Sequence, residues 1–287
     1  MTRIAVNPIQ YWARAGRTEA VLDEAFAELS AIGFGAVKAD VPAGMTASAY
    51  LSWLAGHGLE PAVSLFSSAF DETVDIVAET ERAKQFAAMQ VELGLDRTMV
   101  SSVGVPARAE RPAVGADFSR SRLELAIENC AVICQVLQSE GLRPLHHSHV
   151  GGVFETGAEI SALLDDLGPD VIGVGADTGH LRWAGVDPVA FLARYADRVG
   201  ALHLKDVFPD FLDGRSGTAT YREQADSKRL WAEPGSGVLD FDAILTALPA
   251  GYDGELMIEV DEPSTATRRE SHEISYAWAQ EHLPGVV

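Results

Sequence analysis

Histidine and acidic side chains recur at the ends of four consecutive apolar segments in the second half of the sequence. These segments end in the motifs His146-His147-Ser148-His149, Asp177-Thr178-Gly179-His180, His203-Leu204-Lys205-Asp206 and Glu259-Val260-Asp261. A charge at the end of a buried strand is costly without a partner, so core packing does not explain four such endings in succession. Imidazole nitrogens with carboxylate oxygens suit Mn²⁺, Co²⁺, Zn²⁺ or Fe²⁺, with no strong choice among them. The pattern indicates a divalent-metal or catalytic centre.

Short apolar segments alternate with longer amphipathic ones along the chain. The predicted strands are Ile4–Asn7, Ala36–Ala39, Pro61–Phe66, Arg97–Ser101, Pro144–His147, Val171–Gly175, Gly200–Lys205 and Leu256–Val260. The predicted helices are Thr18–Ile32, Ser48–His57, Asp71–Leu93, Arg120–Glu140, Glu155–Asp166, Pro188–Ala196, Asp240–Leu248 and Thr265–Glu281. This alternation predicts the α/β class and a single (β/α)8 TIM-barrel domain over residues 1–287. No Gly-x-Gly-x-x-Gly motif follows the first strand, which argues against a doubly wound sheet.

Helix ends carry their own signals. Ser48 and Asp240 are expected N-caps, and Gly33, Gly94 and Gly141 follow helix ends where a left-handed residue is favoured.

Two connections, 103–118 and 207–238, are long. Long loops are typically lids or binding loops, and in a barrel both emerge at the C-terminal face, where active sites lie. Decoration or an oligomer contact is an equally weighted alternative.

Further polar and aromatic residues are placed near the predicted mouth. Trp12 follows the first strand and is expected either to form the floor of a pocket or to pack in the core at the end of the barrel. Lys38 ends the second strand, where a structural role is unusual, although its stem can also reach outward to solvent. Ser67 and Ser102 follow the third and fourth strands and are expected to bind substrate hydroxyls or to cap helices. His272, on the last helix, is expected to face solvent.

Composition narrows the class of protein. The chain has 287 residues and 47% hydrophobic residues, so it can form a large core. Its 42 Asp and Glu exceed its 22 Lys and Arg by 20, a surface that repels nucleic acid and anionic lipid. The N-terminus lacks a signal-peptide pattern, and no apolar run is long enough to span a bilayer. With only Cys130 and Cys134, four residues apart, we expect a reduced, cytoplasmic protein.

Several stretches together match a known group of barrels. They are Asn7-Pro8-Ile9-Gln10-Tyr11-Trp12, Leu65-Phe66-Ser67-Ser68-Ala69-Phe70, His147-Ser148-His149-Val150-Gly151 with Glu155-Thr156, Asp177-Thr178-Gly179-His180, His203-Leu204-Lys205-Asp206, Pro234-Gly235-Ser236-Gly237 with Asp240-Phe241, and Glu259. On these residues the chain resembles the xylose isomerase-like TIM barrel superfamily of sugar phosphate isomerases and epimerases, and within it the inosose dehydratases. The similarity spans nearly the whole chain and is densest from 146 to 262.

The resemblance implies an enzyme of carbohydrate metabolism with a divalent metal. Asp177, His203 and Glu259 would hold the metal with one ligand from the fifth strand, for which His147 and His149 both remain open. The implied catalytic residues are Glu259, His180, Lys205 and His149. The implied substrate-binding residues are Trp12, Lys38, Ser67, Ser102, Glu155 and Asp206.

Two departures from the superfamily pattern bear on the reaction. Sugar epimerases carry a Glu as the fifth-strand ligand, whereas this chain has imidazole, so only Glu259 remains as a carboxylate base among the ligands. Such a site favours removal of one proton beside a metal-bound ketone, a metal-stabilised enolate and loss of a β-hydroxyl. Where the dehydratases have Glu in the second strand and after the fourth, this chain has Lys38 and Ser101-Ser102. Inosose itself is therefore one candidate among related keto-polyols.

The leading hypothesis is thus an inosose dehydratase-like lyase acting on a keto-sugar or cyclitol. A keto-sugar isomerase or epimerase on the same site is the first alternative, and a non-catalytic sugar-binding barrel is an alternative of another class. We expect a small-molecule partner, no nucleic-acid or membrane partner, and a homodimer.

Overall fold

The strands form one parallel sheet that closes into a barrel. A computed structural model describes residues 4–214 and 217–283 of the chain, so the ends of the predicted domain 1–287 and two residues of the connection 207–238 lie outside it. The strands are β1 (Ala5–Val6), β2 (Ala36–Lys38), β3 (Glu60–Ala62), β4 (Leu65–Ser68), β5 (Arg97–Ser102), β6 (Arg143–His146), β7 (Gly173–Asp177), β8 (Val199–Leu204) and β11 (Glu255–Ile258). Their order is β3-β2-β1-β11-β8-β7-β6-β5-β4. Since β3 and β4 are parts of one short segment, the two ends of this order are joined, and the predicted α/β TIM barrel is confirmed.

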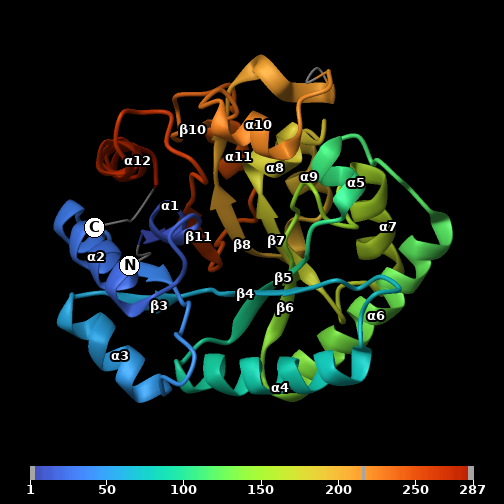
Figure 1. The fold of residues 1–287 in the computed structure, drawn as a ribbon, viewed down its shortest axis with the longest axis horizontal. Coiled ribbons are helices and arrows are strands. Elements are labelled where there is room, and N and C mark those ends of the chain that lie inside the picture. The colour runs from blue at the N-terminus through green and yellow to red at the C-terminus, as the bar shows by residue number, and fades with distance from the viewer. Residues whose placement is uncertain (1–3, 215–216, 284–287) are drawn as a thin grey trace.

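Helices surround the barrel, as Figure 1 shows. The helices on the outside of the barrel are α2 (Glu19–Ile32), α3 (Ala47–Gly56), α4 (Ile76–Glu92), α6 (Arg120–Ser139), α7 (Gly157–Leu167), α9 (Pro188–Arg194), α11 (Phe241–Thr246) and α12 (Arg268–His282). Short helices occupy the loops at the C-terminal ends of strands, namely α1 (Ile9–Trp12), α5 (Pro106–Glu110), α8 (Thr178–Trp183) and α10 (Tyr221–Asp226). The connection after β8 also forms an antiparallel ribbon of β9 (Asp206–Val207) and β10 (Trp231–Ala232). The two long connections therefore carry structure of their own.

Local hydrogen bonds set the helix ends. Asp240 caps α11 as predicted, but the N-cap of α3 is Thr46, whose side chain accepts from the backbone of Ala49, and the prediction of Ser48 was wrong. The predicted start of the third helix, at residue 71, was too early. Asp71 closes a turn with Thr73, and the helix is capped by Asp75.

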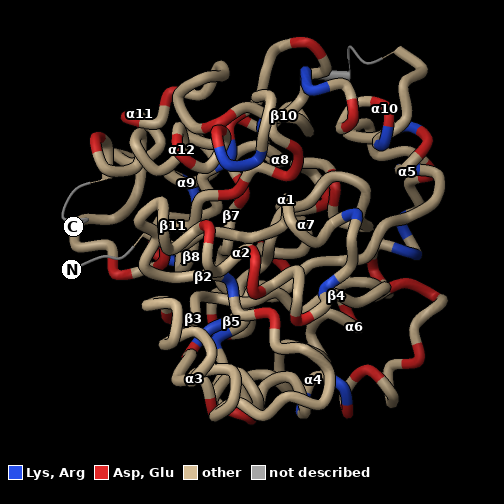
Figure 2. The backbone as a smooth tube through the Cα atoms, turned by 60° about the vertical axis from the view of Figure 1, so that its left-hand side comes forward, with Lys and Arg blue, Asp and Glu red and all other residues tan. Residues whose placement is uncertain are grey.

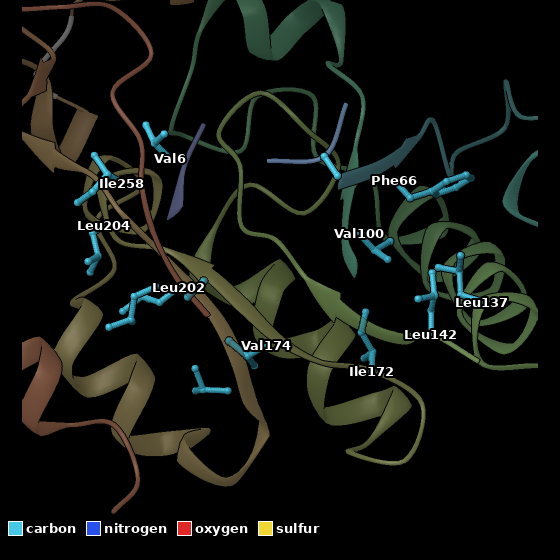
Figure 3. Packing of buried hydrophobic residues seen from close by; sticks show 14 of the residues in the cluster. Val6, Phe66, Val100, Leu137, Leu142, Ile172, Val174, Leu202, Leu204 and Ile258 are labelled. Carbon is cyan, nitrogen blue, oxygen red and sulfur yellow. The ribbon is translucent and has the colours of Figure 1, made fainter. Parts of the chain in front are cut away.

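Side chains alternate across each strand and divide the core into two parts. Val100, Val174 and Leu202 point outward and pack against the helices (Figure 3). The barrel interior holds two small apolar clusters, which are Ala5, Ala36, Ala62 and Met257, and Val63, Met99, Leu145 and Ala201. Because alternation has a period of two residues, the next inward positions lie one layer closer to the mouth. These positions are Asn7, Lys38, Ser67, Ser101, His147, Asp177, His203 and Glu259. The layer above the apolar interior is thus entirely polar.

Surface features agree with the composition. Asp and Glu residues are spread over helices and loops around the whole barrel (Figure 2). None of the described helices is long and apolar enough to cross a membrane. Cys130 and Cys134 are buried on α6 with their sulfur atoms 3.9 Å apart, too far for a disulfide bond.

Candidate metal centre and active site

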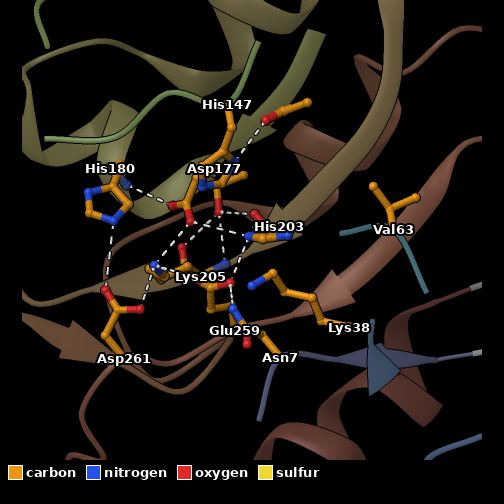
Figure 4. A network of polar contacts seen from close by, with 12 residues as sticks. Asn7, Lys38, Val63, His147, Asp177, His180, His203, Lys205, Glu259 and Asp261 are labelled. Atoms are coloured by element: carbon orange, nitrogen blue, oxygen red, sulfur yellow. Dashed lines mark hydrogen bonds and ion pairs between the residues drawn. The ribbon is translucent and has the colours of Figure 1, made fainter. Parts of the chain in front are cut away.

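Three side chains from neighbouring strands converge at the barrel mouth (Figure 4). His147 directly follows β6, Asp177 ends β7 and His203 lies in β8. One ligand atom from each lies within 4.8 Å of the others, and all three side chains are buried. The alternation of parallel strands brings them to one face, since each occupies the inward position above the apolar interior.

Several polar atoms of this cluster lack hydrogen bonds. Nε2 of His203 is buried without a hydrogen-bond partner in the part of the chain that the structure describes, and Oδ2 of Asp177 makes no hydrogen bond there but lies 3.1 Å from Nζ of Lys205. Nδ1 of His147 lies 3.1 Å from the carbonyl of Gly175 and donates to it, which leaves Nε2 with a free lone pair. Unpaired buried polar atoms are rare, and a second hydrogen bond that fixes the tautomer is typical of a metal-ligating histidine. These residues fit a divalent metal.

Glu259 extends the cluster. Its Oε2 lies 2.8 Å from Nδ1 of His203 and accepts a hydrogen bond of 2.5 Å from Asn7. Its Oε1 accepts from Nζ of Lys205 at 2.7 Å. Burial lowers the pKa of His203, but the carboxylates of Glu259 and Asp177 outweigh burial and raise that pKa to about 9. The four residues expected from the motifs at 147, 177, 203 and 259 therefore lie together.

Lys205 joins the acidic groups of the site. Its Nζ lies 2.7 Å from Glu259, 3.1 Å from Asp177 and 3.0 Å from Asp261, and 4.7 Å from the centre of the Trp231 ring. Burial lowers the pKa of Lys205, but the three carboxylates together raise it well above its usual range. Conversely, burial raises the pKa values of Asp177 and Glu259, but the charge of Lys205, together with hydrogen bonding to His203 and the neighbouring histidines, outweighs burial and lowers both pKa values. Lys205 is a permanent buried cation.

Asp261 is a site residue that we did not select from the sequence. Its Oδ1 accepts from Lys205, and its Oδ2 lies 3.7 Å from Nε2 of His180. The backbone N–H of Val150 donates to Nδ1 of His180, so Nε2 carries the proton of the neutral ring. Burial, opposed by Lys205, raises the pKa of Asp261 to about 6. Asp261 follows Glu259 by two residues, and this spacing was the signal that could have identified it.

His149 lies beside the cluster rather than in it. Its Nδ1 donates to the carbonyl of Val150 at 2.7 Å, so its Nε2 is the unprotonated nitrogen. Its ring centre is 3.9 Å from that of His180 and 6.2 Å from that of Tyr221. Burial lowers the pKa of His149 to about 3, which keeps the ring neutral. Between the two fifth-strand candidates, the geometry favours His147 as the ligand.

A cavity of about 570 Å³ adjoins the cluster on the β4 and β5 side of the mouth. Ser67, Ser101 and Ser102 line it from the strands, and His149, whose ring centre lies 6.2 Å from that of His147, lines it on another side. Ser102 also accepts from the backbone of Val153 at 2.7 Å, whereas Ser101 holds the inward position. Two of the expected substrate-binding residues, Ser67 and Ser102, thus border this space.

Lys38 and Trp12 occupy another part of the mouth. Nζ of Lys38 lies 3.3 Å from Asp40 and 5.7 Å from the centre of the Trp12 ring, and Lys38 is buried. The guanidinium of Arg17 lies 3.8 Å above the Trp12 ring. Substrate binding by Lys38 and Trp12 stays a prediction.

Glu155 and Asp206, which we expected to bind substrate, instead hold loops. The carboxylate of Glu155 accepts from the backbone N–H groups of Gly115 and Gly151. The carboxylate of Asp206 accepts from four backbone N–H groups, those of Val207, Gly235, Gly237 and Leu239. A Cβ on Gly237 would lie 2.3 Å from Oδ1 of Asp206, so this close approach requires glycine. Both carboxylates thus hold loops at the barrel mouth, and substrate binding by Glu155 and Asp206 stays a prediction.

Comparison with known proteins places this barrel in a family. The family model described as xylose isomerase-like TIM barrel matches residues 26–282, and the chain belongs to that family. An inosose dehydratase of Geobacillus kaustophilus is 27% identical over 278 residues, which cover 92% of this chain and 87% of the relative.

Two solved structures show the same fold. A probable 3-DHS dehydratase, AsbF of Bacillus anthracis, superposes with a TM-score of 0.69 at 13% identity, covering 97% of this chain and 98% of the other. The IolI protein with a bound zinc atom superposes with a TM-score of 0.69 at 13% identity, covering 97% of each chain. Identities this low support the shared fold alone.

Proposed function

We propose that this protein is a divalent-metal-dependent carbon–oxygen lyase that dehydrates a keto-sugar or keto-inositol. The observation that carries the proposal is the buried cluster of His147, Asp177 and His203, whose ligand atoms lie within 4.8 Å and include atoms without hydrogen-bond partners among the described residues. The inosose dehydratase that is 27% identical over 92% of this chain supports the same class of substrate.

His147, Asp177, His203 and Glu259 would hold the metal. When bound, the metal would supply Lewis-acid stabilisation of negative charge on the ketone oxygen of the substrate. Nitrogen and oxygen donors in this proportion suit Zn²⁺, Mn²⁺, Co²⁺ or Fe²⁺. Both oxygens of Glu259 already contact Lys205 or Asn7, so we assign Glu259 to holding the site and not to moving a proton.

Proton transfer falls to the groups beside the cluster. His149 borders the cavity with an unprotonated Nε2, and we assign it removal of the proton next to the ketone. His180 carries a proton on Nε2 facing Asp261, and this pair protonates the leaving β-hydroxyl, so that it departs as water. Lys205 keeps Glu259 and Asp261 in place through hydrogen bonds of 2.7 and 3.0 Å.

A keto-sugar isomerase or epimerase is the second candidate. Such an enzyme needs acid–base groups on both faces of the substrate. Asp261 supplies a second carboxylate in addition to Glu259. Its Oδ1 lies 3.0 Å from Nζ of Lys205, and its Oδ2 lies 3.7 Å from Nε2 of His180. This second carboxylate is the observation that favours the alternative.

One experiment separates the two reactions. Metal-loaded protein is incubated with 2-keto-myo-inositol in D₂O, and products are followed by proton NMR. We expect loss of water and an α,β-unsaturated ketone, and we expect His149→Gln to lose this activity. His282→Gln, a half-buried histidine on α12, is the matched control and should keep it. Solvent exchange or isomerisation without elimination would refute the lyase and support the second candidate.

A further inference from the structure

The cavity next to the cluster has two kinds of wall. Its floor consists of hydroxyl groups at the ends of β4 and β5, from Ser67, Ser101 and Ser102. Its outer wall is formed by the loops and includes Val103, Ala109 and the ring of Tyr221. Hydroxyl groups match a polyol, whereas aliphatic and aromatic surfaces match an apolar group.

The cavity is larger than one polyol ring requires. Its volume is about 570 Å³. A liquid water molecule occupies about 30 Å³, and a ring atom less, so the six carbons and six oxygens of a keto-inositol fill less than about 360 Å³. The remaining space lies toward the loops, because the hydroxyl-lined floor is at the strand ends.

The outer wall is held in place by buried hydrogen bonds and caps. Arg108 of α5 donates to the carbonyls of Gly152 and Val153 and forms a buried ion pair with Glu159. On the opposite side, α10 begins with a capping box between Thr220 and Glu223, and α10 packs against α5. A wall built in this way exists before the ligand arrives, so it selects ligands by shape.

The charged residues that line the cavity do not argue against an apolar ligand group at its outer wall. Arg222 and Glu110 are exposed at the rim, and Arg222 forms an ion pair of 2.8 Å with Asp226 of its own helix. Val103 and Ala109 are also exposed, and the half-buried ring of Tyr221 completes the apolar part of the lining.

We propose that the substrate is a keto-sugar or keto-cyclitol joined to a ring-sized apolar group. The polyol part lies on the hydroxyl floor next to His149, and the apolar group lies against Val103, Ala109 and Tyr221. The polyol part of this inference rests on the proposed function, whereas the apolar group rests on the cavity alone.

Two ligands that differ only in this group test the proposal. The phenyl and methyl glycosides of the same 3-keto-hexose are titrated into the metal-loaded full chain by calorimetry. We expect the phenyl glycoside to bind at least tenfold more tightly, because the ring replaces water along the apolar wall. In Val103→Trp, which fills the outer part of the cavity, we expect the phenyl preference to be lost.

Val114→Trp is the matched control. Val103 and Val114 lie in the same connection and are each 44% exposed, but only Val103 belongs to the cavity lining among the described residues. We expect Val114→Trp to keep the phenyl preference, and thermal unfolding should show both variants folded. Equal affinities of the wild type for the two glycosides would overturn the inference, as would an unchanged preference in Val103→Trp.

Turnover of 2-keto-myo-inositol distinguishes this inference from the proposed function. Dehydration of this compound without a phenyl preference would refute the apolar subsite and leave the lyase standing. A phenyl preference without any dehydration would refute the lyase and support the assignment of the cavity.

Discussion

Two groups of acidic residues lie at the same end of this barrel and differ in what they bind. Asp177 and Glu259 belong to the cluster, where Oδ2 of Asp177 lies 3.1 Å from Nζ of Lys205 and Oε2 of Glu259 lies 2.8 Å from Nδ1 of His203. Glu155 and Asp206 each bind backbone N–H groups with both carboxylate oxygens. The residue types and the distance from a strand end are alike. What separates the two groups is the kind of partner. Oδ2 of Asp177 and both oxygens of Glu259 face side chains at the barrel mouth, Lys205 first among them, whereas Glu155 and Asp206 hold backbone N–H groups of loops.

The largest difference should appear when a cluster carboxylate is neutralised. In Asp177→Asn, the amide still accepts from the backbone of His180 but offers the metal no charge, so we expect metal affinity to fall more than about 100-fold. Metal titration and turnover are the measurements. Asp187→Asn, which keeps a good cap at the start of α9, is the control and should bind metal normally. Retained metal binding in Asp177→Asn would remove the distinction between the two groups.

The clamp at Asp206 should show the opposite behaviour. Asp206→Ala leaves four backbone N–H groups without their acceptor, and we expect the free energy of unfolding to fall by about 2–4 kcal/mol. Metal affinity of the folded fraction should be unchanged. Urea unfolding and metal titration of the same preparation measure both quantities. A stable Asp206→Ala protein with weakened metal binding would reverse the assignment.

A buried histidine away from the mouth offers a test by pH. His272 was expected to face solvent, but it is buried, stacks on Tyr11 and donates from Nδ1 to the carbonyl of Arg268. Burial lowers the pKa of His272 from 6.5 to about 4. Between these values the unfolded chain binds a proton that the folded chain does not, so stability falls as pH decreases from about 6.5 to 4, by about 3 kcal/mol.

The pH effect is measured as a difference between two proteins. Urea unfolding of the wild type and of His272→Gln is compared at pH 7 and pH 4.5. We expect the variant to lose less stability over this range, because it lacks the group that must stay neutral. Equal pH dependence in the two proteins would show that His272 is not a buried neutral residue.

The smallest effect is expected at Glu155. Glu155→Gln keeps one oxygen for the backbone of Gly115 or Gly151 but places an NH₂ group opposite the other donor, and we expect a loss of about 1–2 kcal/mol in unfolding free energy. Substrate affinity should change less than twofold. If calorimetry shows a large loss of substrate affinity at unchanged stability, Glu155 binds substrate after all.

The sequence predicted the barrel and the convergence of its polar residues well, because both follow from periodicity. Apolar alternation placed His147, Asp177 and His203 at successive strand ends, and parallel strands bring such ends together. The short helices α1, α5, α8 and α10 were not predicted, since four to six residues are too few to show a helical period. The equally short α11 was predicted, and its N-cap Asp240 is a signal that does not depend on length.

Residue roles were harder to predict because they depend on distant partners. Nothing near Asp206 in the sequence shows that Gly235, Gly237 and Leu239 donate to it, since those residues follow about 30 positions later. The same holds for the tautomer of His147, which depends on the carbonyl of Gly175. Asp261 could have been found, because it continues the inward face from Glu259.

The central claim is that one cation binds between the ends of four strands. Anomalous diffraction from a crystal of metal-loaded protein tests it most directly. The account predicts one strong peak in the barrel mouth, with the metal about 2.0–2.3 Å from Nε2 of His147, the carboxylates of Asp177 and Glu259 and a ring nitrogen of His203. A peak elsewhere on the chain, or none at full metal loading, would contradict it.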